Sequence, residues 1–113
     1  MVEYVQLLTT VGKREDAERI ARRLVEERLA ACVQIVGPIT SVYRWRGRVE
    51  VSEEWLCLAK TERGLYEEAE RAIRELHPYE LPEIIALPVA AGSKEYLEWV
   101  SREVRRGPSA QDI

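Results

Sequence analysis

The segment 77–83, HPYELPE, concentrates the residue types in this chain that could do chemistry. It contains the only histidine, His77, together with Tyr79 and Glu83, and it is stiffened by two prolines. An imidazole can ligate a metal ion or titrate near neutral pH. In the alternative, structural interpretation, the prolines shape a turn and the ring bonds a backbone carbonyl. A helix before this segment should end at about Leu76, because the residue before a proline is disfavoured in the α region.

Three other features are candidates for binding. Lys60 ends a largely apolar strand and Glu83 opens another, so the two, with Tyr79, could bind an anionic ligand in a cleft between subunits or form a structural ion pair. Cys32 is a candidate metal ligand, although its apolar strand also suits a small core residue. Five aromatic residues are expected either to line a pocket or to pack in the core and at interfaces. They are Tyr43, Trp45, Tyr79, Tyr96 and Trp99.

The composition is that of one folded domain spanning residues 1–113, with 46% hydrophobic and 33% charged residues. The last residues, 107–113, are expected to form an irregular tail. No apolar run approaches the roughly 20 residues of a membrane span, and the start of the chain lacks the pattern of a signal peptide. We therefore expect a cytoplasmic protein without a membrane partner.

Charge and residue usage narrow the function classes further. A net charge of -3 argues against a nucleic-acid partner, because phosphate contacts need a basic surface. The chain has no asparagine, one methionine and much arginine, which is typical of thermophile proteins.

The two cysteines are expected to be reduced thiols. Cys57 is expected opposite Val36 on the neighbouring strand, which places it too far from Cys32 for a disulfide.

Hydrophobic periodicity predicts the order β-α-β-β-α-β-α. The expected strands are 2–10, 31–46, 48–61 and 83–89, and the expected helices are 13–29, 63–76 and 93–105. The last helix should turn Tyr96, Leu97, Val100 and Val104 inward. This order predicts an α+β, ferredoxin-like βαββαβ fold with an added C-terminal helix.

The long hairpin formed by 31–46 and 48–61, with a two-residue turn expected at Arg46-Gly47, predicts an oligomer. Each arm would measure roughly 50 Å if straight, whereas a compact chain of this size is about 35 Å across. The hairpin must therefore bend at Gly37-Pro38, where a bulge is expected, or project from the domain. A projecting apolar ribbon with unpaired edges would be covered most simply by other copies of the chain.

Five segments together resemble the CutA (CutA1) divalent-cation-tolerance family. They are ACVQI at 31–35, SVYRWRGRVE at 41–50, the pair Lys60-Thr61, HPYELPEIIALPV at 77–89 and YLEWV at 96–100. The resemblance implies a homotrimer with long hairpins pairing between subunits, similar in build to PII signalling proteins. It also implies a role in tolerance of divalent metals, copper especially, and it implies no chemical reaction.

The resemblance also bears on the metal ligands. Copper-associated bacterial members carry a cysteine near the end of the first strand and a histidine pair before the proline of HPY. The corresponding positions here are Thr9, Leu76 and His77, so only His77 retains a ligand. A thiolate with two imidazoles suits copper, whereas one imidazole needs further groups, which three copies of His77 or Glu83 could supply.

Two main functions follow as hypotheses. The first is a homotrimeric divalent-cation-tolerance protein that takes part in the response to metal ions and binds copper or another divalent cation. The alternative is a PII-like trimer that senses a small ligand, or acts as a scaffold, without a metal site. We expect no enzyme, because the chain lacks a Ser/His/Asp set, a glycine-rich phosphate loop and a CxxC motif.

Overall fold

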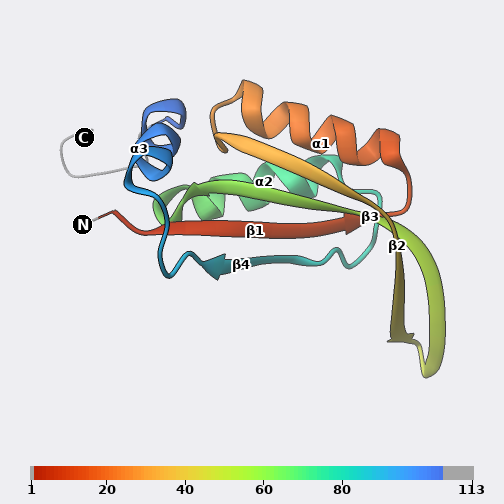
Figure 1. The fold of residues 1–113 in the computed structure, drawn as a ribbon. Helices are drawn as coiled ribbons and strands as arrows, with labels where there is room; N and C mark the ends of the chain where they lie inside the picture. The colour runs from red at the N-terminus through yellow and green to blue at the C-terminus, as the bar shows by residue number, and fades with distance from the viewer. Residues whose placement is uncertain (1, 106–113) are drawn as a thin grey trace.

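The computed structural model describes residues 2–105, and its elements follow the predicted order (Figure 1). The expected tail at 107–113 lies outside the described residues. The strands are β1 (Tyr4–Val11), β2 (Cys32–Trp45), β3 (Arg48–Glu62) and β4 (Ile84–Pro88). The helices are α1 (Arg14–Glu26), α2 (Tyr66–Leu76), which a short 3₁₀ turn precedes, and α3 (Lys94–Glu103). The predicted α+β, ferredoxin-like fold with an added C-terminal helix is confirmed.

The four strands form one antiparallel sheet in the order β2-β3-β1-β4. Helices α1 and α2 lie on one face of it (Figure 1). Alternate residues of β1, such as Val5 and Leu7, point toward these helices and are buried. The apolar stripes that cover them recur at helical spacing: Ala17, Ile20 and Leu24 of α1, and Ala69, Ala72 and Ile73 of α2.

The β2–β3 hairpin both bends and projects. Its two-residue turn places Arg46 and Gly47 at φ values of 52° and 80°, the positive pair that a type I′ hairpin turn requires. β1 ends with the pair Val11–Trp55, so the outer part of the hairpin lacks a third strand and curves away from the helices (Figure 1). The chain extends 48 Å with a radius of gyration of 15.0 Å, above the roughly 13 Å of a compact 100-residue domain.

A bulge at Gly37-Pro38 marks the bend. Val36 pairs with Leu56 and Ile39 with Glu54, so two residues of β2 lie opposite one residue of β3. The predicted pairing of Cys57 with Val36 was therefore wrong by one position, because the extra bulge residue shifts the register. Cys57 pairs with Ile35. Both thiols are free, as expected.

The turn after α1 also holds α3 in place. Arg28 has a φ of 59°, and its guanidinium donates to the carbonyls of Arg102 and Glu103 at 2.7 and 2.8 Å. These carbonyls end α3 and lack partners within the helix. Of the α3 residues expected to point inward, Val100 and Val104 are buried, but Tyr96 is 42% exposed. Tyr96 packs instead against Trp99, with ring centroids 5.5 Å apart.

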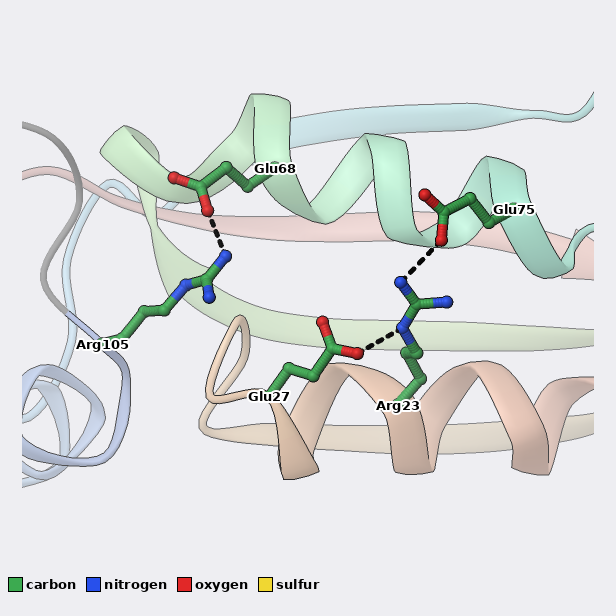
Figure 2. Close-up of polar contacts among 5 residues, drawn as sticks. All are labelled: Arg23, Glu27, Glu68, Glu75 and Arg105. Carbon is green, nitrogen blue, oxygen red and sulfur yellow. Dashed lines mark hydrogen bonds and ion pairs between the residues drawn. The ribbon is translucent and has the colours of Figure 1, made fainter.

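Ion pairs connect the helical layer at its surface (Figure 2). Arg23 of α1 bonds Glu75 of α2 at 2.7 Å and also bonds Glu27. Arg105, after α3, pairs with Glu68 of α2. Because such exposed pairs contribute about 0–1 kcal/mol each, the buried apolar layer stabilises the fold more than they do.

Candidate functional site

His77 is the C-cap residue of α2 and the first residue of the connector 77–83. Helix α2 ends at Leu76 as predicted, and His77 is extended at φ -76° and ψ 129°. Its Nε2–H donates to the carbonyl of Thr10 at 2.9 Å, and its Nδ1 accepts the Tyr79 backbone N–H at 3.2 Å. The ring thus ties the connector to the end of β1, as the structural interpretation of this histidine expected.

This arrangement fixes the protonation of His77. Because Nε2 meets a carbonyl it must carry the proton, and Nδ1 uses its lone pair on the Tyr79 amide. Burial lowers the pKa of His77, opposed chiefly by its hydrogen bond to Thr10. The neutral ring therefore has no free lone pair for a metal ion while both bonds persist.

Tyr79 reaches a carboxylate that the sequence analysis missed. Its hydroxyl donates to Glu54 Oε2 at 2.7 Å, and Glu54 is only 6% exposed. Burial and the carboxylate of Glu54 raise the pKa of Tyr79 far above its ordinary value. One signal was present in the sequence: because side chains alternate along a strand, Glu54 points to the same sheet face as the apolar residues Leu56 and Leu58.

A cavity of about 730 Å³ lies between the bent hairpin and the connector. Arg46 at the hairpin tip bonds Glu80 of the connector at 3.2 Å and so joins the two segments. Tyr79 and Glu83, two of the predicted cleft residues, both line this cavity. The complete lining combines aromatic, hydroxyl and charged side chains: Thr10, Ser41, Val42, Tyr43, Arg44, Trp45, Glu54, Pro78, Tyr79, Glu80, Leu81 and Glu83.

Lys60 and Cys32 lie elsewhere, so the structure does not unite them with the connector. Lys60 pairs with Gln6 of β1 and Cys32 of β2, and Gln6 is four residues, about 13 Å at strand rise, from Thr10. Lys60 donates to Gln34 and lines a separate cavity of about 240 Å³ that Tyr96 also borders. The predicted cleft of Lys60 with Tyr79 and Glu83 is therefore not formed within one chain.

The candidate metal ligands are likewise dispersed. Within residues 2–105, no three His, Cys, Asp or Glu side chains converge closely enough to hold a metal ion. Thr9, which stands where copper-associated relatives have cysteine, is 2% exposed and pairs with buried Cys57. Cys32 is half-buried, and burial together with this thiol raises the pKa of neighbouring Tyr96.

Comparisons with known proteins agree with this fold. The family model described as "CutA1 divalent ion tolerance protein" matches residues 5–103. The chain is 50% identical over 94 residues to "Divalent-cation tolerance protein CutA" of Thermus thermophilus, covering 83% of this chain and 91% of that protein. It is 41% identical over 104 residues to "Protein CutA, chloroplastic" of Arabidopsis thaliana, covering 92% of this chain but only 57% of that protein.

The solved structures show the same architecture. The crystal structure of CutA1 from Oryza sativa superposes with a TM-score of 0.91 at 38% identity, covering 94% of this chain and 97% of that one. None of the helices within residues 2–105 has the length and apolar character of a membrane span. From the family match and these identities, the chain belongs to the CutA1 divalent ion tolerance protein family.

Proposed function

We propose that this chain acts in tolerance of divalent cations as a homotrimer that responds to metal ions and binds copper or another divalent cation. The metal would be held by groups that come together between copies. The observation that carries this proposal is the sheet face opposite α1 and α2, which is not covered by a helix of the described chain (Figure 1).

That face offers a surface for assembly. Its partly buried residues are Leu8, Leu56 and Leu58, and its exposed ones are Val36, Ile85 and Leu87, at 44–47%. They share one face because cross-strand partners point the same way: Leu8 pairs with Ile85, and Leu56 with Val36. Contiguous apolar surface of this kind marks interaction sites.

The hairpin supports the same conclusion. Val42, Val49 and Val51 on its outer part are 63–66% exposed, and an isolated two-stranded ribbon is only marginally stable in water. Pairing with other copies would bury these residues and satisfy the free strand edges.

The metal component depends on assembly. Because no three candidate ligands meet within the described chain, a site needs side chains of more than one copy. His77, Cys32 and Glu83 are the candidates, and His77 would have to give up its bond to Thr10 or to the Tyr79 amide before it could ligate.

The second candidate function is a PII-like trimer that senses a small ligand and has no metal site. The cavity of about 730 Å³ beside the connector favours it, since small-molecule sites commonly enclose about 300–1,000 Å³.

Calorimetric titration of the full chain with Cu²⁺ separates the two functions. The metal proposal predicts saturable binding that weakens in His77→Ala or Cys32→Ser, with Glu53→Gln, an exposed site on β3, as the matched control. Absence of saturable binding, or binding that both ligand variants leave unchanged, would favour the small-ligand alternative. The assembly state of each variant is measured in parallel by sedimentation velocity, so that loss of the trimer is not read as loss of a ligand.

A further inference from the structure

The cavity between the hairpin and the connector contains a buried carboxylate without a cationic partner. Glu54 is 6% exposed and lines the cavity. Among the described residues, its one side-chain hydrogen bond is from the neutral Tyr79 hydroxyl at 2.7 Å. Of the ion pairs that the structure contains within residues 2–105, none includes Glu54. A buried charge is costly unless it is paired, so a cation in the cavity would stabilise this carboxylate.

The walls around Glu54 are aromatic and held in position. The Tyr43 hydroxyl bonds Ser52 Oγ at 2.8 Å. Tyr79 is held by Glu54 and by an edge contact with His77, with ring centroids 4.9 Å apart. Aromatic faces attract organic cations as well as apolar groups. The cavity therefore combines a fixed anion with fixed aromatic surface.

The charge balance of the lining favours a cation. Three carboxylates line the cavity, those of Glu54, Glu80 and Glu83, against one guanidinium, that of Arg44. Glu80 is already paired with Arg46. A hard divalent ion would need several converging oxygen ligands, which the described residues do not assemble.

We propose that this cavity binds a small organic cation, a protonated arylalkylamine or a similar amine, whose ammonium group pairs with Glu54 while its hydrocarbon part lies against Tyr43 and Tyr79. This inference names the ligand class for the small-ligand function and rests on that alternative. It does not depend on the metal proposal.

A titration with matched probes tests it. The full chain, in buffer containing EDTA, is titrated calorimetrically with 2-phenylethylamine, with the neutral analogue 2-phenylethanol and with the anion phenylacetate. We expect the amine to bind, and the two analogues to bind at least about tenfold more weakly, because they cannot pair with the carboxylate. EDTA removes divalent metal, so failure of the metal proposal leaves this result unaffected.

Variants locate the site. Glu54→Gln should weaken amine binding about tenfold or more, whereas Glu53→Gln, an exposed neighbour that does not line the cavity, should leave it unchanged. If Glu54→Gln does not fold, Tyr43→Leu decides the question, since it removes an aromatic wall without touching the carboxylate and should weaken binding about fivefold.

Three results would overturn the proposal: no amine binding, equal binding of amine and alcohol, or equal loss in Glu54→Gln and Glu53→Gln. The first of these results can be accompanied by a change of assembly state in Glu54→Gln. That result would assign the carboxylate to a basic side chain of a second copy.

Discussion

The Tyr79 hydroxyl donates a 2.7 Å hydrogen bond to Glu54, and this contact joins the connector to the hairpin. Next to it, His77 joins the same connector to the end of β1 through Thr10. Three segments distant in sequence are thus fixed around one cavity. A Cβ at Gly12 would lie 3.2 Å from the Tyr79 hydroxyl, so the chain is closely packed around this tyrosine as well.

Removal of the Tyr79 hydroxyl tests that junction. Tyr79→Phe should lower the free energy of unfolding by about 1–2 kcal/mol, because it leaves a buried carboxylate without its donor. Urea denaturation measures the change. Tyr43→Phe is the matched control, since the bond it removes, to Ser52, is exposed, and it should cost less. Equal losses of unfolding free energy in the two variants would show that the burial of Glu54 does not add to the cost of removing its donor.

The single histidine predicts a pH dependence. Burial lowers the pKa of His77 in the folded chain, whereas the unfolded chain keeps about 6.5. The unfolded state therefore binds more protons as the pH falls through 6.5, and the free energy of unfolding should decrease toward acid pH and level off below the folded-state pKa.

Comparison with His77→Gln isolates this effect, because the chain has one histidine and the carboxylates are common to both proteins. Urea denaturation at pH 7.5 and pH 5.5 should show a larger loss of stability in the parent chain than in the variant. An equal loss in both, or a parent chain that gains stability at pH 5.5, would contradict the burial of a neutral ring.

The bulge predicts a strict requirement for glycine at position 37. A Cβ there would clash with the Trp55 ring, so Gly37→Ala must displace the indole and should cost about 1–3 kcal/mol. Gly64→Ala is the control, because nothing lies within 4 Å of a Cβ at that position. Thermal denaturation of both variants should leave Gly64→Ala near the parent chain, and similar losses would argue against the contact with Trp55.

Arg28 predicts a coupling between α1 and α3. Arg28→Ala should lower the free energy of unfolding by about 1–2 kcal/mol, because it removes two hydrogen bonds to the end of α3. Arg28→Gly loses the same bonds but relieves the backbone, so it should cost less. Denaturant unfolding measures the stability of both variants. If Arg28→Gly is less stable than Arg28→Ala, the prediction is wrong.

The sequence predicted the elements well because their signals are local. Period-two and helical patterns marked each strand and helix, and Pro78 fixed the end of α2 at Leu76. The hairpin turn at Arg46-Gly47 and the bend at Gly37-Pro38 were also predicted correctly. The register beyond the bend was not, because pairing depends on which residues a bulge leaves unmatched.

The candidate site was predicted only in part. Tyr79 and Glu83 share a cavity as expected, but Lys60 belongs to the other end of the sheet. Glu54 was missed because a charged residue in a strand is usually solvated. Its burial follows from the curl of the hairpin over the connector, a tertiary relationship that no short sequence pattern encodes.

Native mass spectrometry of the full chain, titrated with Cu²⁺, tests the central claim most directly, because it reads assembly and metal binding together. The account predicts a species of three times the 13.1 kDa chain mass that gains a defined number of copper ions, with no metal retained by any free single chain. A single-chain species at working concentration, or a trimer whose mass is unchanged by copper, would contradict it.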